Sequence, residues 1–232
     1  MSELPADRIT VTRITNARVP TDYGEFQLGY YSNTLDEKDH LAFYMGDDLS
    51  GDDVLVRVHS ECLTGDVFGS RRCDCGEQLD QALQVIAEEG RGVLVYLRQE
   101  GRGIGLLQKL HAYNLQDEGH DTVDANLMLG HGADERSYKL AALILEDLGI
   151  ESVRLITNNP DKIAALEVDG IKVNARVELP AAFNADNSLY LMTKAKRMNH
   201  MLNVPAASAQ PTPPTSPNQN RDSDPVEPQP AD

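Results

Sequence analysis

The three cysteines of this 232-residue chain lie close together, at Cys62, Cys73 and Cys75, in the pattern C-x10-C-x-C. Three thiols cannot pair off into disulfides, and a single cluster of this kind is typical of a metal site. Zinc binds thiolate readily, and three protein ligands leave its fourth tetrahedral position open, as in catalytic zinc sites. A helix expected at 76–89 would lower the pKa of Cys75 through its N-terminal dipole. The alternative interpretation is three unrelated buried thiols, because the spacing is not that of a standard zinc finger.

The composition limits the class of protein to which these thiols belong. A formal net charge of -16 argues against a module that binds the phosphate backbone of DNA or RNA. Thiols gathered into a metal site, without a disulfide pattern, fit the reducing cytoplasm. The sequence holds no apolar run long enough to span a bilayer, and its polar N-terminus lacks the apolar core of a signal peptide. We therefore expect a cytoplasmic protein with no nucleic acid and no membrane as a partner.

The region around the cysteines differs in charge from the rest of the chain. Residues 57–109 carry nearly equal numbers of basic and acidic side chains, whereas the flanking regions are acidic. The arginines in this region could bind a small polyanion locally while the remaining surface repels larger ones. The alternative is that they are ordinary solvated arginines, above all Arg91.

Two segments in which a strand leads through a turn into a helix are expected to position the cysteines and a ligand. The first is an apolar strand at 92–97, followed by the turn R-Q-E-G-R-G-I-G and a helix at 104–118. Glycines let the backbone approach a phosphate, and the N–H groups of a helix N-terminus point at it, although such turns also occur for geometry alone. The second is a strand at 152–157 followed by N-N-P-D-K, where Asn159 is a good N-cap and Lys162 falls in the first helical turn. This second turn is another candidate anion site.

The remaining pattern predicts further elements around these two segments. Strands are expected at 9–19, 25–31, 41–45, 54–59 and 171–177, helices at 134–148, 160–169 and 187–202, and a polar loop at 119–133. Together they predict one α/β domain over residues 1–203, a mixed sheet with helices packed on it and an N-terminal β-hairpin region. Residues 204–232 hold most of the 12 prolines and no aromatic residue, which predicts a disordered, proline-rich acidic tail.

Six motifs, taken together and in order, resemble a known enzyme family. They are R-V-H-S-E-C-L-T-G-D, R-R-C-D-C-G, R-Q-E-G-R-G-I-G-L, A-Y-N-L-Q-D, A-D-E-R-S-Y and L-I-T-N-N-P-D-K, and the resemblance runs from about residue 10 to 202. The family is GTP cyclohydrolase II, which opens riboflavin biosynthesis. The resemblance implies zinc-dependent hydrolysis of GTP to 2,5-diamino-6-(5-phospho-D-ribosylamino)pyrimidin-4(3H)-one, formate and pyrophosphate. It also implies one Zn2+ per subunit, Mg2+ bound with the GTP triphosphate, and a homodimer.

The resemblance also assigns roles to residues of the site. Cys62, Cys73 and Cys75 fall on the zinc ligands, and a zinc-activated hydroxide would attack C8 of the guanine ring. Tyr113 matches the catalytic tyrosine near the zinc, since ring opening needs a hydroxyl close to the reacting carbon. The residues carried over as nucleotide contacts are Arg57, Glu61, Gln78, Glu100, Arg102, Thr122, Thr157 and Lys162.

Asp134 and Arg136 fall on the family's proposed proton acceptor and proposed nucleophile. That nucleophile is thought to form a covalent guanylyl-enzyme as pyrophosphate leaves. The residues alone indicate simpler roles, a helix N-cap for Asp134, a surface arginine for Arg136 and a half-buried helix aromatic for Tyr113. An arginine with a pKa above about 12 suits a phosphate clamp better than a nucleophile, so both roles stay open for Arg136.

Two other functions remain alternatives. A related enzyme could stop at the formylated, ring-opened intermediate, which loss of the tyrosine would favour, but Tyr113 is present. A zinc-stabilised module could bind GTP or a partner without turnover, which loss of a metal ligand or of A-D-E-R would favour, but both are present. The sequence lacks the dihydroxybutanone-phosphate synthase domain to which this family is often fused, so we expect a monofunctional enzyme. His59, in the same stretch as the cysteines, is expected to be structural rather than a ligand.

Overall fold

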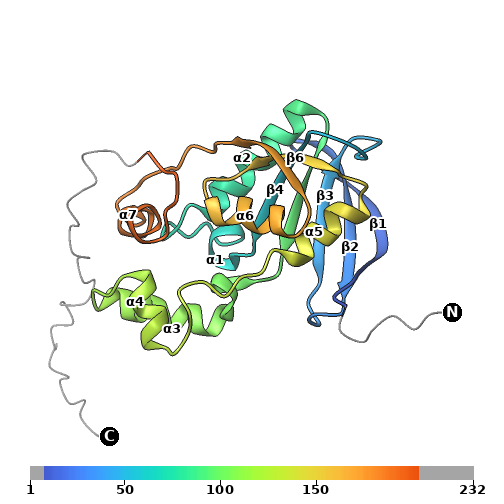
Figure 1. Cartoon of the computed structure of the whole chain (residues 1–232). Coiled ribbons are helices and arrows are strands. Elements are labelled where there is room, and N and C mark those ends of the chain that lie inside the picture. Colours follow the sequence, from blue (N-terminus) through green and yellow to red (C-terminus); the bar gives the residue numbers. More distant parts are fainter. Residues whose placement is uncertain (1–7, 204–232) are drawn as a thin grey trace, which may run out of the picture.

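The computed structural model describes residues 8–203. Within them a seven-stranded sheet runs in the order β1-β2-β3-β5-β4-β6-β7 (Figure 1). Its strands are β1 Val11–Thr21, β2 Gly24–Asn33, β3 His40–Met45, β4 Val54–Ser60, β5 Gly92–Leu97, β6 Ser152–Ile156 and β7 Lys172–Val177. The predicted disordered tail at 204–232 lies outside the described residues.

The N-terminal strands β1 and β2 form the predicted hairpin. At its turn the Thr21 hydroxyl donates to the carbonyl of Gly24 over 2.8 Å, and Gly24 has a φ of +132° that residues with a side chain rarely adopt. Strand β3 pairs antiparallel with both β2 and β5, whereas β5, β4, β6 and β7 are parallel neighbours. The sheet is therefore mixed, and the predicted α/β fold class is confirmed.

Helices cover both faces of the parallel strands, of which β4, β5 and β6 are buried along most of their length. The helices are α1 Leu63–Asp66, α2 Cys75–Glu89, α3 Gly105–Asp117, α4 Thr122–Met128, α5 Lys139–Asp147, α6 Pro160–Val168 and α7 Ser188–Arg197. On one face α5 buries Ile144 and Leu145, and on the other α2 buries Ala82 and Ile86 against Leu94. Full burial of one such leucine or isoleucine contributes about 1.5–3 kcal/mol to stability.

The predicted loop at 119–133 is wrong, because it contains helix α4. Asp121 caps that helix, since its carboxylate accepts from the N–H groups of Val123 at 2.8 Å and Asp124 at 3.0 Å. The glycines and polar residues around this helix are typical of a loop, so the cap was not recognised in the sequence. Helices α3 and α4 together form a small lobe beside the sheet (Figure 1).

Two predicted helix boundaries are also corrected. Helix α5 begins at Lys139 rather than at 134, because the N–H groups of Glu135 and Ser137 donate to Arg102 and Gln99 instead of starting a helix. Helix α7 ends at Arg197 rather than near 202. Among the described residues, the helices are all too short or too polar to cross a membrane.

Candidate active site

The three cysteine side chains meet where β4 and the start of α2 come together. Cys62 directly precedes α1, Cys75 is the first residue of α2, and the sulfur atoms of these two and Cys73 lie within 4.8 Å of one another. The Sγ atoms of Cys62 and Cys73 are 3.6 Å apart. Tetrahedral zinc with bonds of about 2.3 Å would place its sulfur ligands roughly 3.8 Å apart. The donor set and its spacing therefore fit zinc, with one coordination position left for another ligand.

The backbone beside the sulfurs is shaped to leave them room. A Cβ at Gly65 would lie 2.9 Å from the Cys73 sulfur and 3.2 Å from the Cys62 sulfur. Only glycine keeps α1 this close to the cluster, since real Cβ contacts under 3.0 Å are essentially never seen.

The three thiols differ in pKa, so they do not lose their protons equally readily. Hydrogen bonds from the other two thiols and the charge of Lys109 hold the pKa of Cys62 far below its usual range, against the effect of burial. The same bonds raise the pKa of Cys73 to about 11 and the pKa of Cys75 well above its usual value. The predicted lowering at Cys75 by the helix dipole is thus outweighed by the neighbouring sulfurs. One thiolate forms readily, and a bound cation favours deprotonation of the other two.

Hydrogen bonds to the carboxylate of Asp66 fix the position of Cys62. Its buried carboxylate accepts from the Cys62 N–H at 2.9 Å, from the Tyr96 hydroxyl at 2.9 Å and from His59 Nε2 at 3.0 Å. Burial is the main cause that lowers the pKa of His59, so its ring is neutral at pH 7. His59 therefore supports the site through Asp66, in agreement with its expected structural role.

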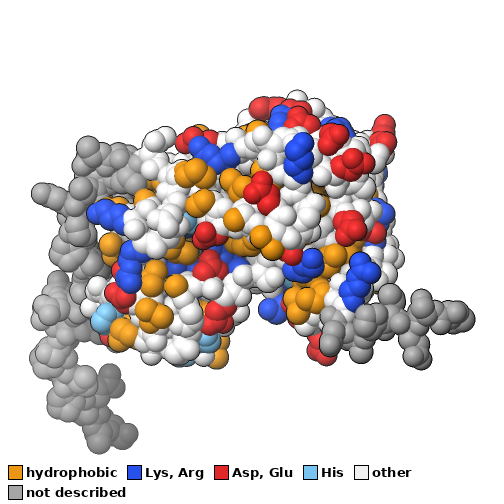
Figure 2. Space-filling view, viewed as in Figure 1, with side chains coloured by type: hydrophobic (Ala, Val, Ile, Leu, Met, Phe, Trp, Pro, Cys, Tyr) orange, Lys and Arg blue, Asp and Glu red, His pale blue; other side chains and the backbone are white. Residues whose placement is uncertain are grey.

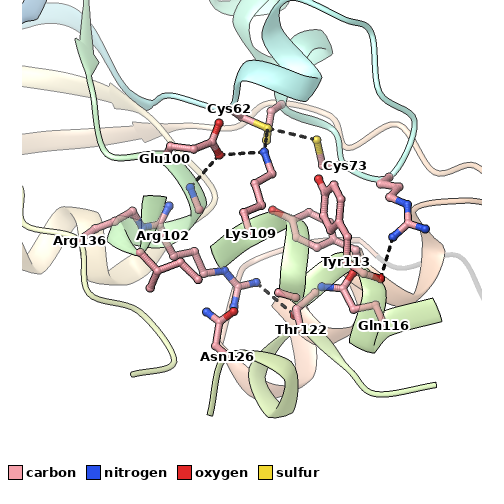
Figure 3. Close-up of a pocket in the computed structure, with 16 residues that line it drawn as sticks. Cys62, Cys73, Glu100, Arg102, Lys109, Tyr113, Gln116, Thr122, Asn126 and Arg136 are labelled. Atoms are coloured by element: carbon pink, nitrogen blue, oxygen red, sulfur yellow. Dashed lines mark hydrogen bonds and ion pairs between the residues drawn. The ribbon is translucent and has the colours of Figure 1, made fainter. Parts of the chain in front are cut away.

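A pocket opens directly from the sulfurs toward the α3–α4 lobe (Figure 3). Besides the cysteines, the predicted residues that line it are Glu100, Arg102, Tyr113, Thr122 and Arg136. The Tyr113 hydroxyl lies 3.4 Å from that of Thr64 near the cluster, and an Arg102 N–H donates to Thr122 over 3.2 Å. Arg102 has a left-handed φ of 61°, and its carbonyl accepts from the N–H of Glu135 at 2.9 Å.

Lys109 is a site residue that the sequence analysis missed. Its Nζ donates to the Cys62 sulfur over 3.1 Å and to Glu100 Oε1 over 2.8 Å (Figure 3). Burial opposes its charge, yet Cys62 and Glu100 raise the pKa of Lys109, so it remains a cation. Lys109 lies four residues before Tyr113, so both side chains are on one face of α3. This spacing could have identified Lys109 from the sequence.

A second pocket lies on the far side of the cysteines. The predicted residues that line it are Arg57, Cys75, Gln78, Arg102, Arg136, Thr157 and Lys162. Lys162 is buried and donates to the carbonyl of Val58 over 2.7 Å. Burial first, and then the nearby charges of Arg57 and Arg136, hold the pKa of Lys162 well below its usual value. Arg57, Arg102 and Arg136 make the lining of this pocket cationic, which suits a phosphorylated ligand.

Two predicted residues stand outside both pockets. Glu61 accepts from Arg98 Nε at 2.9 Å, and Asp134 accepts from Arg136 Nε at 2.9 Å. Asp134 does not cap α5, which begins five residues later. Its contact with the site runs through Arg136, whose side chain it orients.

The two pockets adjoin and form one hollow. Helices α3 and α4 line its first part, whereas the second part lies among the ends of β4 and β6 and helices α2, α6 and α7. Cys75, Arg102, Arg136 and Tyr190 line both of them. Figure 2 shows both basic and acidic side chains where the α3–α4 lobe meets the rest of the molecule, and the chain as a whole carries a net charge of -16.

Three clustered thiols that could hold a metal open onto a hollow lined by arginine and lysine, an arrangement typical of an enzyme site. The sequence model of the family described as GTP cyclohydrolase II matches residues 12–178. The chain belongs to this family.

Two bacterial proteins illustrate the similarity. The chain is 57% identical over 197 residues to "Riboflavin biosynthesis protein RibBA" of Mycobacteroides abscessus, covering 83% of this chain and 47% of that protein. It is 57% identical over 194 residues to the protein of the same name from Bacillus mycoides, covering 84% and 49%. The chain thus spans about half the length of the curated relatives it matches. A solved two-domain 3,4-dihydroxy-2-butanone 4-phosphate synthase, RibBX from A. baumannii, aligns at a TM-score of 0.41 and 20% identity over 74% of this chain and 41% of that one.

Proposed function

We propose that this chain is a GTP cyclohydrolase II that acts in riboflavin biosynthesis. It hydrolyses GTP to the diaminopyrimidine ribosyl phosphate, formate and pyrophosphate. The observation that carries the proposal is the shared wall of the two pockets, where Cys75, Arg102 and Arg136 face both. A nucleotide laid across this wall would place its base at the sulfurs and its phosphates among the cations.

The cysteine side of the hollow is suited to opening the guanine ring. Cys62, Cys73 and Cys75 would hold one zinc ion, which would supply a water of lowered pKa, about 7, for hydrolysis. Lys109 compensates the negative charge of the thiolates through its contact with Cys62. Burial raises the pKa of Tyr113, so its hydroxyl keeps a proton that it can donate near the reacting carbon.

The cationic side of the hollow is suited to the triphosphate. Burial opposes the charge of Arg136, but Tyr138 and Asp134 raise its pKa, so the guanidinium stays protonated. A permanently charged guanidinium favours the role of phosphate clamp over that of nucleophile, and Asp134 then holds the clamp in place. Arg102 and Lys162 would contact further phosphate oxygens, and Mg2+ bound with the triphosphate would offset its charge while needing few protein ligands.

The remaining polar residues would recognise the rest of the nucleotide. Gln78 and Glu100 offer an amide and a carboxylate to the base, while Arg57, Thr122 and Thr157 offer donors to ribose and phosphate. Glu61 pairs with Arg98 in this structure, so contact with the donor-rich guanine edge would require that pair to open. We further propose that the enzyme is cytoplasmic and homodimeric, as the family resemblance implies.

The test is turnover of GTP with identification of the products by mass, before and after removal of zinc with a chelator. Zinc-dependent appearance of the diaminopyrimidine, formate and pyrophosphate supports the proposal. A formylated product alone identifies the enzyme that stops early. Binding of GTP without any product under zinc-replete conditions identifies a binding module and overturns the proposed activity.

A further inference from the structure

Helix α7, which lies beyond the segment matched by the family, contributes to the same hollow. Tyr190 lines both pockets, and Lys194, one helical turn later, lines the second. Lys194 Nζ lies 4.5 Å from the centre of the Tyr190 ring. These two side chains therefore form one face of α7 that is turned toward the ligand site.

Contacts on its other sides hold α7 in this position. Leu191 is fully buried beneath the helix. Arg197 donates to Asp124 of α4 over 2.9 Å, and just after the helix the N–H of Met201 donates to the carbonyl of Asn158 over 2.9 Å. The helix is thus attached both to the α3–α4 lobe and to the loop after β6.

The strongest contact of α7 with the site is a buried ion pair. Lys194 Nζ lies 2.8 Å from Asp74 Oδ1, and the two residues are 9% and 1% exposed. Asp74 stands between Cys73 and Cys75 in the sequence and directly precedes α2. Removing one partner of such a pair leaves a charge that is buried and uncompensated.

A chain of hydrogen bonds connects Asp74 to residues of the second pocket. Its Oδ2 accepts from Gln78 Nε2 at 2.5 Å, and Gln78 Oε1 in turn accepts from an Arg57 N–H at 2.6 Å. Arg57 also donates to the carbonyl of Ile156 over 3.0 Å. Its Nε is buried and has no hydrogen-bond partner among the described residues, and the Arg57 side chain lines the second pocket.

We propose that Lys194 is a positioning residue for the nucleotide, because through Asp74 and Gln78 it sets the orientation of Arg57. The inference rests on the proposed function for the identity of the ligand. It assigns α7 to the binding site, because the orientation of Arg57 in the second pocket then depends on Lys194. Lys194 acts through other side chains, so its loss weakens binding and leaves the chemical step at the sulfurs intact.

The test compares Lys194→Met with Lys194→Arg, and uses Lys196→Met as the matched control. Lys196 is exposed on the same helix. Calorimetry on zinc-loaded protein measures binding of a GTP analogue with a methylene bridge between the α- and β-phosphates. Steady-state assays give KM and kcat for GTP, and a chromophoric chelator measures zinc content. We expect Lys194→Met to weaken binding and raise KM at least tenfold, with kcat within threefold and zinc retained.

The variants Lys194→Arg and Lys196→Met test whether the loss of binding is specific to the charge at position 194. Lys194→Arg, which keeps the charge, should return binding to within threefold of the native protein, and Lys196→Met should change nothing. If circular dichroism shows that Lys194→Met does not fold, Asp74→Asn/Lys194→Met removes both charges together. We expect it to fold and still bind weakly, because a neutral amide holds Gln78 less firmly than an anchored carboxylate.

Several results would overturn the inference. A folded Lys194→Met variant that binds the analogue within threefold of the native protein rejects it, as does the double variant if it binds like the native protein. Loss of zinc in parallel with loss of binding also rejects it, because Lys194 would then act on the cysteine loop instead of on Arg57. Native protein that binds neither GTP nor the analogue overturns the proposed function together with this inference.

Discussion

Replacing Gly65 by alanine is expected to disturb the sulfur cluster while leaving the fold intact. The added Cβ would lie 2.9 Å from the Cys73 sulfur and 3.2 Å from the Cys62 sulfur. Packed carbon atoms prefer separations of about 3.5–4.0 Å, so at least one sulfur must move by roughly half an ångström. The geometry that suits zinc would be lost by this movement.

The size of the effect follows from two opposing terms. Gly65 lies in α1 and needs no left-handed φ, so alanine should favour the local helix by about 0.5–1 kcal/mol. Perturbing groups that orient metal ligands typically lowers metal affinity about 10- to 100-fold. That loss corresponds to about 1.4–2.8 kcal/mol of binding free energy, so zinc binding should weaken although the apo-protein is not destabilised.

The assay is competition for zinc against a chromophoric chelator, together with thermal unfolding of the metal-free protein. Gly132→Ala is the control, because its Cβ would meet the flexible side chain of Glu135 at 3.4 Å and the backbone oxygen of Asp134 only at an ordinary contact distance of 3.9 Å. A Gly65→Ala variant that binds zinc as tightly as the native protein would show that the cluster is not held by close packing against α1.

Three further predictions concern the metal ligands, the cationic pocket and the C-terminal segment. Cys73→Ser should abolish formate release while pyrophosphate release persists, since only ring opening needs the metal; equal persistence of both products would contradict the zinc assignment. GTP binding should take up a proton at Lys162, because burial depresses its pKa in the free protein and a triphosphate favours the charged form. Affinity should then fall as pH rises, and calorimetry in buffers of different ionisation enthalpy should show proton uptake that Lys162→Met removes; no buffer dependence in the native protein would refute this. Ending the chain at residue 203 should leave kcat and KM unchanged, and a large loss of activity would assign the removed segment a role.

The parts of the site that follow from local spacing could be predicted from the sequence. Cys62, Cys73 and Cys75 converge as expected, because a strand end and a helix start bring short segments together. The apolar runs at 92–97 and 152–157 likewise became buried parallel strands. In these stretches the local preference and the final fold agree.

The parts that depend on distant contacts could not. Lys109 and Lys194 look like ordinary solvated helix lysines, and only the packing of α3 and α7 against the sulfur loop buries them. Asp134 has the sequence of an N-cap, yet the next N–H bonds to the turn at Arg102, and the helix starts later. Glu61 neighbours a metal ligand in sequence, but it pairs with Arg98 outside both pockets.

The contrast between an acidic chain and a cationic hollow bears on how fast the substrate arrives. At long range the net charge of -16 repels a polyanion, whereas attraction begins only once the ligand is close to the buried cations. Salt at about 0.1 M screens charges beyond roughly 10 Å, so it should weaken the outer barrier more than the inner attraction. Association with GTP should therefore speed up as ionic strength rises from very low values, the reverse of the usual behaviour of electrostatically steered enzymes.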